Sequence, residues 1–544
     1  MNISICAPEG TPTQSPVAAE VERRRTFAII SHPDAGKTTL TEKLLFFGGA
    51  IQLAGQVKAK RAQRTTRSDW MAIERERGIS VVTSVMTFEH DGRVFNLLDT
   101  PGHEDFSEDT YRTLTAVDSA VMVIDAAKGI EPRTRKLFEV CRLRDIPIIT
   151  FINKMDRESR DPLDLIDEIE KTLALDAAPI TWPIGRGGDF IGTIHVESNG
   201  VRLLDGDAGS AGKLHQMALA EIVALSPKFD PATFTGELDL VRHACKRFDP
   251  RAFGEGHMTP VFFGSALKDF GVGDLLKALA EMAPPPRARD ADMRVVAAAE
   301  LGMAAFVFKI QANLDPNHRD RIAFVRLCSG KLTRGMKVKQ VRTGKIITLR
   351  APQFFFAQDR ALADEAYAGD VVGIPNHGTL RIGDTLTEGE ELNFAGVPNF
   401  APEILRRVRL PDAMKAKKLK QALLQLAEEG VAQVLRPIDG SPAVVGVVGP
   451  LQLDVLRARL ANEYEVEINW DTTEYQLARW IAADDRKVLD LFVTAHRSAI
   501  AEDFDGGLVF LARSTFDLDY TRKQNTAIAF ADVKDVHRRN WSKT

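Results

Sequence analysis

The stretch "FAIISHPDAGKTTLTEKLLFF", residues 27 to 47, decides how the amino-terminal half of the chain folds. An apolar run, a tight polar loop and a helix-like segment follow one another in it, and this order is typical of a phosphate-binding loop. Such loops read G-x-x-x-x-G-K-[ST]; Gly36, Lys37 and Thr38 match, whereas Ser31 replaces the first glycine. Lys37 would reach the terminal phosphates and Thr38 would bind Mg²⁺. The alternative is a Gly-Lys-Thr that simply opens a helix.

Length and composition predict a soluble protein of several domains. At 544 residues the chain is long for one domain, and about 150 residues per domain predicts three or four. No run of about 20 apolar residues is present to span a bilayer, so we expect no membrane partner. A net charge of -4 gives no sign of a protein that coats DNA or RNA as a whole. The four cysteines have neither metal-type nor redox-type spacing, which favours a reducing cytoplasm.

Changes of pattern along the chain predict the domain boundaries. Residues 1 to 24 are expected to form a flexible tail rather than a signal peptide, because they contain no apolar core and the basic cluster comes last. Over residues 25 to 284 short apolar runs alternate with amphipathic stretches, which predicts a doubly wound α/β domain with a mostly parallel sheet. A linker rich in proline follows at 285 to 298.

The rest of the chain has two further patterns. Short strands separated by turn residues over 299 to 395 favour an antiparallel β-barrel. Residues 400 to 544 alternate helices and strands, which predicts an α+β domain with split βαβ units and a carboxyl-terminal extension. We see no internal repeat in the sequence.

A second motif, "LLDTPGHED" at residues 97 to 105, follows an apolar strand directly. A carboxylate at a strand end, here Asp99, can hold Mg²⁺ through a water, and the N–H of Gly102 can sense a terminal phosphate. Alone, D-x-x-G mostly marks a turn. At this distance from a phosphate loop, it predicts a metal-binding switch.

The third motif, "NKMD" at residues 153 to 156, ends another strand. The Asp156 carboxylate can accept hydrogen bonds from N1 and N2 of guanine, whereas adenine offers no such pair of donors. Asn153 would tie this loop to the phosphate loop, and the stem of Lys154 would cover the base. Standing alone, the motif would be a solvated turn. The later "GSAL" at 264 to 267 could offer the Ala266 N–H to guanine O6.

Phosphate, metal and base motifs in this order indicate a guanine-nucleotide domain. We expect Mg²⁺ to be held by Thr38 and Asp99. The residues expected to contact GTP or GDP are Ser31, His32, Pro33, Asp34, Ala35, Gly36, Lys37, Thr38, Thr39, Asp99, Gly102, Asn153, Lys154, Asp156, Ser265 and Ala266.

The motif set resembles that of the translational GTPases, which work on the ribosome. The stretches "SHPDAGKTTLTEKLL", "ERERGIS", "LLDTPGHEDF" and "NKMD" carry the resemblance. It implies that the Ser80 hydroxyl lies near Mg²⁺, and that His103 is catalytic and positions the attacking water. It also implies that Pro33 and Ile79 form an apolar gate around that histidine, with proline departing from the valine of some relatives. The alternative for His103 is a cap on the helix that follows it.

Within that family the chain is most similar to the branch that acts at termination. The resemblance implies a GTP-driven switch that removes class-one release factors from the ribosome, contacts ribosomal RNA and proteins, and is a monomer. The chain ends soon after its third domain, which we take as an argument against a translocase. A GTPase of elongation or ribosome rescue, a nucleotide-binding scaffold without turnover, and an ATP-using kinase are the alternatives; "NKMD" disfavours the last.

Basic clusters mark the third domain. Between residues 401 and 460 we count ten Lys and Arg against six Asp and Glu, with "RRVRL" and "KAKKLK" as the clusters. Such a surface could meet ribosomal RNA through its phosphates. Equally, "KAKKLK" could be the solvated face of an amphipathic helix.

Overall fold

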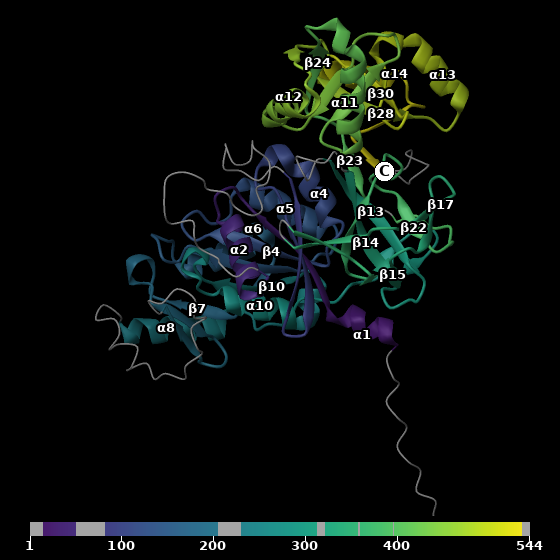
Figure 1. Ribbon diagram of the computed structural model, residues 1–544. Coiled ribbons are helices and arrows are strands. Elements are labelled where there is room, and N and C mark those ends of the chain that lie inside the picture. The colour runs from purple at the N-terminus through teal and green to yellow at the C-terminus, as the bar shows by residue number, and fades with distance from the viewer. Residues whose placement is uncertain are drawn as a thin grey trace, which may run out of the picture.

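The computed structural model describes residues 15–50, 82–204, 230–312, 321–356, 359–394 and 396–535, over which the chain forms three domains. In Figure 1 the first two domains lie side by side and the third lies above them. No helix in these described ranges is long and apolar enough to cross a membrane.

The first domain is built on a sheet of order β2-β3-β1-β4-β5-β10-β6, with β1 (Arg24–Ser31) inside it. Neighbouring strands run parallel except in the β2–β3 hairpin. The other strands are β2 (Ser84–His90), β3 (Arg93–Asp99), β4 (Ser119–Asp125), β5 (Ile148–Asn153), β6 (Asp176–Pro179) and β10 (Met258–Phe263). Parallel strands need helical crossovers, which bury both faces of the sheet and explain the apolar runs in the sequence.

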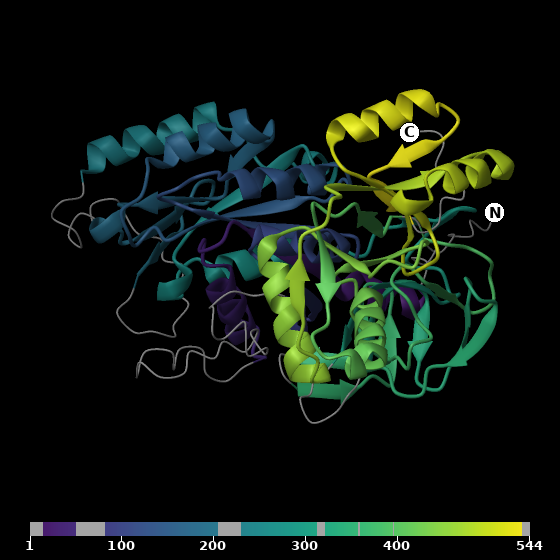
Figure 2. The same ribbon diagram turned by 90° about the horizontal axis from the view of Figure 1, so that it is seen from above.

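Helices cover both faces of this sheet, as Figure 2 shows. Alternate residues of β1 point to opposite faces: Phe27 packs in one apolar cluster with Leu40 and Leu275, and Ala28 in another with Leu137. The doubly wound fold predicted from the sequence is therefore confirmed. The helices are α2 (Lys37–Phe47), α4 (Ser107–Leu114), α5 (Pro132–Arg142), α6 (Pro162–Leu173), α8 (Pro231–Ala244), α9 (Pro250–Gly254) and α10 (Val272–Glu281), and a side sheet contains β7 (Thr181–Ile184), β8 (Gly192–His195) and β9 (Val201–Leu203).

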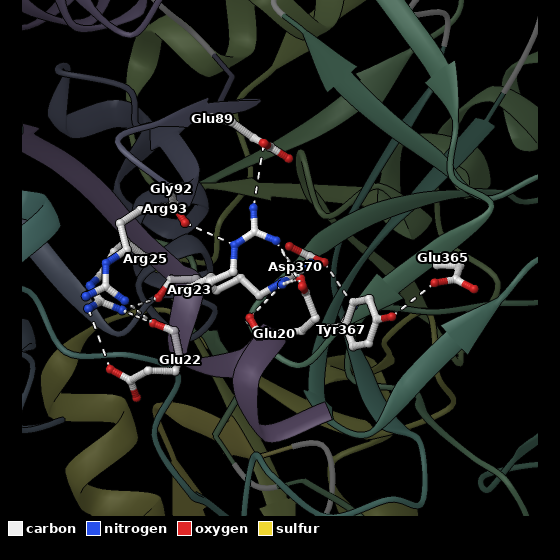
Figure 3. Close-up of polar contacts among 12 residues, drawn as sticks. Glu20, Glu22, Arg23, Arg25, Glu89, Gly92, Arg93, Glu365, Tyr367 and Asp370 are labelled. Carbon is white, nitrogen blue, oxygen red and sulfur yellow. Dashed lines mark hydrogen bonds and ion pairs between the residues drawn. The ribbon is translucent and has the colours of Figure 1, made fainter. Parts of the chain in front are cut away.

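Helix α1 (Pro16–Arg23) precedes β1 and lies inside the segment that we predicted to be a flexible tail. The prediction was wrong for residues 16 to 24, because Ser15 caps the helix and Glu20 pairs with Arg23 and Arg24. Figure 3 shows Glu20 and Arg23 of this segment in the same group of polar contacts as Asp370 and Tyr367 of the second domain. Residues 1 to 14 lie outside the described ranges.

Arg24 joins the first domain to the second. Its Nε donates to the fully buried Asp370 at 3.1 Å, and its guanidinium lies 4.7 Å from the centre of the Tyr367 ring. Gly369 fits here only without a side chain, since a Cβ would lie 2.4 Å from Pro286 and 2.9 Å from Arg24. The close packing of the two domains at this point therefore requires a glycine at position 369.

The second domain is an antiparallel half-barrel of order β17-β16-β22-β13-β14-β21-β18-β19 around an apolar core, which agrees with the predicted β-barrel. A short hairpin of β11 (Arg289–Asp290) and β12 (Val295–Val296) lies in the segment that we expected to be a linker. The half-barrel strands are β13 (Ala304–Ala312), β14 (Arg321–Ser329), β16 (Lys337–Gln340), β17 (Lys345–Thr348), β18 (Gln353–Phe356), β19 (Asp359–Leu362), β21 (Val371–Pro375) and β22 (Thr385–Thr387), with β15 (Lys331–Thr333) paired to β20 (Glu365–Tyr367).

The third domain repeats one topology, although we saw no internal repeat in the sequence. Within residues 396–535 two βαββαβ units follow one another, with sheet orders β27-β24-β26-β25 and β29-β30-β28-β31 joined by β25–β29. Each order is that of a split βαβ unit. The elements are β24 (Ile404–Arg409), α11 (Ala416–Glu428), β25 (Gln433–Pro437), β26 (Val444–Val447), α12 (Pro450–Tyr464), β27 (Asn469–Asp471), β28 (Leu477–Ala482), α13 (Arg486–Ala495), β29 (Ile500–Glu502), β30 (Leu508–Ala512), α14 (Thr515–Gln524) and β31 (Ala529–Ala531), and β23 (Pro398–Phe400) pairs with β32 (Val533–Asp535).

Candidate guanine-nucleotide site

The phosphate-loop candidate turns the chain from β1 into α2. Gly36 has φ 95°, and a Cβ there would lie 2.3 Å from Asn153 Nδ2, so backbone and space both require glycine. Helix α2 begins without a side-chain cap, which leaves its first backbone N–H groups for an anion. Ser31, the departure from the usual motif, is buried, and its hydroxyl donates to the His32 carbonyl at 2.9 Å. The substitution therefore leaves the turn intact.

Lys37 and Asp99 meet beside this loop. Lys37 Nζ lies 2.5 Å from Asp99 Oδ1, and both side chains are buried. The parallel register of β1 and β3 sets Asp99 opposite Ile29, two residues before the loop. Mg²⁺ in phosphate-transfer sites takes one or two protein oxygens together with phosphate oxygens, and Thr38 with Asp99 is a donor set of that kind. The structure thus brings together the groups that we assigned to phosphate and metal.

The loop after Asp99 lies against the phosphate loop. Thr100 Oγ1 donates to the Ile29 carbonyl at 2.7 Å, and a Cβ at Gly102 would lie 3.7 Å from Pro33 Cα. Backbone that starts at Gly102 is therefore placed where it can respond to a bound phosphate. Ser80 and Ile79, the other switch residues that we named, lie outside the described residues.

Asn153 connects the three loops of the site. Its Nδ2 donates to the Ala35 carbonyl at 2.8 Å, and its Oδ1 accepts from the backbone N–H groups of Lys154 and Ala266, each at 2.9 Å. The tie between base loop and phosphate loop has the geometry that we expected. Ala266 differs from expectation, because its N–H donates to Asn153 rather than facing outward to a base. Ser265, beside it, caps the following turn by accepting from Lys268 N at 3.3 Å.

Lys154 and Asp156 form the base-selecting end. Lys154 has φ 71°, and its Nζ reaches the Asp34 carbonyl at 2.5 Å and Asp125 Oδ2 at 2.6 Å, so its stem spans the loop. Burial would raise the pKa of Asp125, but the hydrogen bonds from Lys154 and the Ala127 N–H, together with nearby lysine charge, outweigh it and hold that pKa below its usual value. Asp156 Oδ1 is buried and accepts no hydrogen bond within the described chain. A buried acceptor without a donor is what a guanine N–H pair would satisfy.

Sequence reasoning missed Asp125 and Glu131. Asp125 ends β4 beside Asn153 and anchors Lys154. Glu131 Oε1 lies 3.1 Å from His32 Nε2 and so contacts the phosphate loop from the start of α5. A carboxylate at the end of the apolar run "AVMVID" was a visible signal for Asp125, whereas nothing local to Glu131 indicated its partner.

His103 begins the one-turn helix η2 (Glu104–Phe106). Its Nδ1 accepts from Asp105 N at 3.3 Å, its side chain is 36% exposed, and its ring packs edge-on against Phe106 at 6.3 Å. The capping alternative for His103 therefore describes its contact correctly. Because capping uses only Nδ1, it leaves Nε2 for a role in chemistry.

Helix α4, which follows, lies where the three domains meet. Asp109 binds Lys309 of β13 at 3.0 Å, and Arg112 donates to the Gly430 carbonyl at 2.9 Å and to Asn399 at 3.2 Å. Arg112 also pairs with Glu108 at 2.7 Å. A cleft lined by Asp109, Lys309 and Gly430 lies between these elements. The helix after the switch loop is therefore held by the second and third domains.

The basic clusters of the third domain are mostly paired or solvated. In "KAKKLK" Leu419 packs inward, Lys418 pairs with Glu465 at 2.7 Å, and Lys417 and Lys420 are exposed. In "RRVRL" Arg409 lies 3.4 Å from Asp471. The solvated-face interpretation of α11 therefore fits the structure.

Comparison with known families assigns the chain. The family model of the elongation factor Tu GTP-binding domain matches residues 22–285, and that of elongation factor G domain 2 matches residues 302–389. A model described as the C-terminal domain of the class II release factor RF3 matches residues 394–522. The chain belongs to the translational GTPases. The resemblance seen in the sequence and the prediction of an enzyme that hydrolyses GTP are both confirmed.

A solved structure supports the same arrangement of domains in this translational GTPase. A crystal structure of a protein from Thermus thermophilus matches with a TM-score of 0.68 and 25% sequence identity, covering 84% of this chain and 69% of that one. The likeness therefore extends beyond the GTP-binding domain into the domains that follow it.

Proposed function

We propose that this translational GTPase acts at termination. With GTP bound it engages the ribosome, in the cytoplasm, and promotes the dissociation of a class-one release factor after the peptide has been released. The observation that carries the proposal is the match of residues 394–522 to the C-terminal domain of a class II release factor. The monomeric state and the contacts with ribosomal RNA and proteins belong to the same proposal.

The nucleotide is selected by the loops at the sheet edge. Asp156 accepts the two guanine donors, and ATP is rejected because adenine would leave this carboxylate oxygen unpaired. Asn153 holds the base loop in register with the phosphate loop. Lys37 and the first N–H groups of α2 bind the phosphates, and Thr38 with Asp99 would hold Mg²⁺. Bound Mg²⁺ neutralises charge on the β- and γ-phosphates.

Hydrolysis depends on His103. With Nδ1 occupied by Asp105 N, a neutral ring carries its proton on Nε2 and presents it to the oxygens near the terminal phosphate. That arrangement would orient water or stabilise developing charge, and removal of one such preorganised hydrogen-bond donor typically costs about 10² to 10³ in rate. Loss of the terminal phosphate would release the loop at Gly102 and shift α4 against the two domains that hold it.

The test measures GTP hydrolysis and departure of a labelled class-one release factor from ribosomes stopped at a stop codon. We expect ribosomes to stimulate hydrolysis, and the factor to leave in the presence of GTP but not of a non-hydrolysable analogue or of ATP. His103→Ala should bind GDP like the parent and hydrolyse GTP about 100-fold or more slowly on ribosomes. Stimulated hydrolysis with a release factor that stays bound would contradict the termination role and leave elongation or rescue.

A further inference from the structure

Asp105 joins the His103 loop to the third domain. Its Oδ2 accepts from Leu451 N at 2.7 Å, and its side chain is 7% exposed. Leu451 lies in the first turn of α12, directly after Pro450, which has no N–H to offer. A carboxylate at the start of a 15-residue helix is stabilised by the unpaired N–H groups and the helix dipole. The first domain therefore supplies the N-terminal cap of a third-domain helix.

Gly449 leaves the space for this contact. A Cβ at Gly449 would lie 2.1 Å from Asp105 Cγ and 2.2 Å from Oδ1, so the Asp105 carboxylate would have to move away from α12. The backbone of Gly449 is extended, with φ -141° and ψ 162°, a conformation that any residue adopts. Its lack of a side chain is therefore required by the domain contact and not by its own backbone.

The same residue holds the imidazole. The backbone N–H of Asp105 donates to His103 Nδ1 at 3.3 Å, and Asp105 Oδ1 lies 3.5 Å from that nitrogen. When the Asp105 carboxylate is fixed on α12, its backbone is fixed as well, and with it the direction of the His103 ring. Movement of the third domain would release both.

We propose that Asp105 is a positioning residue through which the third domain sets the orientation of His103, so that GTP hydrolysis depends on where α12 lies. The inference rests on the proposed catalytic role of His103. The chain of contacts is short: Leu451 N holds the carboxylate in the space that Gly449 leaves, and Asp105 N holds Nδ1 of the ring.

The experiment compares single-turnover GTP hydrolysis at saturating ribosomes with the Kd for a fluorescent GDP analogue. Gly449→Ala should lower the hydrolysis rate constant about tenfold, equivalent to about 1.4 kcal/mol, with GDP affinity and ribosome KM unchanged. Asp105→Ala should act similarly. Asp105→Asn, which keeps an oxygen for Leu451 N, should stay within about threefold of the parent.

A double variant tests whether the two residues act through one contact. Asp105→Ala combined with Gly449→Ala removes the clash, so it should hydrolyse no more slowly than Asp105→Ala alone. The matched control is Gly446→Ala, whose Cβ would lie 2.5 Å from Pro402 Cγ inside the third domain, away from Asp105. It should lower thermal stability and leave the rate constant unchanged.

The outcomes separate this inference from the proposed function. Parent-like rates for Gly449→Ala and Asp105→Ala, with His103→Ala inactive, overturn the positioning role alone. Equal slowing by Gly446→Ala and Gly449→Ala also overturns it, because general damage to the third domain would then suffice. A parent-like rate for His103→Ala overturns the catalytic role on which the inference rests. Failure of the release factor to leave, with the expected pattern of rates, overturns the termination role only.

Discussion

Asn153 Nδ2 donates to the Ala35 carbonyl oxygen at 2.8 Å, and this hydrogen bond joins the base-selecting loop to the phosphate loop. The two residues are 118 positions apart in the chain. Their contact exists because β1, β4 and β5 run parallel and end at one edge of the sheet, where doubly wound folds bind ligands. A nucleotide that binds at this edge contacts the base-selecting loop with its base and the phosphate loop with its phosphates. These two loops are already joined by the Asn153–Ala35 hydrogen bond.

Asn153→Ala should weaken nucleotide binding and the site itself. It leaves the Ala35 carbonyl and the Ala266 N–H buried without their partner, and a tenfold to hundredfold fall in GDP affinity, about 1.4 to 2.8 kcal/mol, is expected. Titration with a fluorescent GDP analogue measures it. Asn393→Ala, which removes a hydrogen bond to Asp292 in an exposed part of the second domain, is the control and should bind like the parent. Equal GDP affinities for the parent, Asn153→Ala and Asn393→Ala would contradict the role of Asn153 in connecting the two loops.

Asp156→Asn should change the base that the site prefers from guanine to xanthine. Asparagine offers one acceptor and a donor where Asp156 offers acceptors only, which suits the C2 oxygen of xanthine and repels the guanine amino group. We expect GDP affinity to fall at least about hundredfold and xanthosine diphosphate to bind in its place. Competition of both diphosphates against a fluorescent nucleotide measures this. Retention of GDP preference by the variant would show that Asp156 does not read the base.

The sequence predicted those parts of the site that depend on strand ends. Asp99 and Asn153 each end an apolar run that the sequence predicts to be a strand. Because the carboxyl ends of parallel strands lie at one edge of a sheet, the sequence also predicts that these two residues lie near each other. Gly36 was predictable too, since a strand-to-helix turn around phosphate needs a left-handed residue.

Contacts between domains were not predictable in the same way. Arg24 and Asp370 lie 346 positions apart, so no pattern near the basic cluster at residues 23 to 25 indicates that Arg24 is buried against the second domain. The repeat of βαββαβ units was not predictable from the sequence either, because two segments can share one topology without having similar residues. Ala266 was assigned to a base because the motif offers a free N–H; its bond to Asn153 depends on the packed loop.

Asp370→Ala should destabilise the interface of the first two domains. Asp370 accepts from Arg24 at 3.1 Å, Asn96 at 3.2 Å and Tyr367 N at 2.8 Å, and it is fully buried. Removing one partner of a buried ion pair typically costs about 3 to 5 kcal/mol, because the other charge stays buried. Hydrogen exchange of β1 and β20 should rise and the first thermal transition should fall.

Glu365→Ala is the matched control for Asp370→Ala. Glu365 of β20 pairs with Lys331 of β15 at 2.6 Å, close to Asp370 in the chain, and Figure 3 shows its contact with the Tyr367 hydroxyl. Because this pair is exposed, its loss should change exchange and thermal stability little. Similar effects of the two variants would mean that the buried charge pair contributes no more to the interface than an exposed pair nearby.

Lowering the pH should weaken the contact between α4 and β13 of the half-barrel, because Asp109 loses its charge and with it the ion pair to Lys309. Burial would raise its pKa, but Lys309 and the Thr83 donors outweigh burial and hold the pKa below the ordinary 3.8. A carboxyl with a lowered pKa contributes stability above the ordinary value and loses it as pH falls through the folded value. The stability difference between the parent and Asp109→Asn should therefore be greatest near about pH 6 and shrink toward about pH 3, measured by hydrogen exchange of α4.

Asp167→Asn, which removes an exposed pair with Lys171 on α6, should show no such trend. A difference for Asp109→Asn that stays constant with pH would show that Lys309 and Thr83 do not bind its charged form.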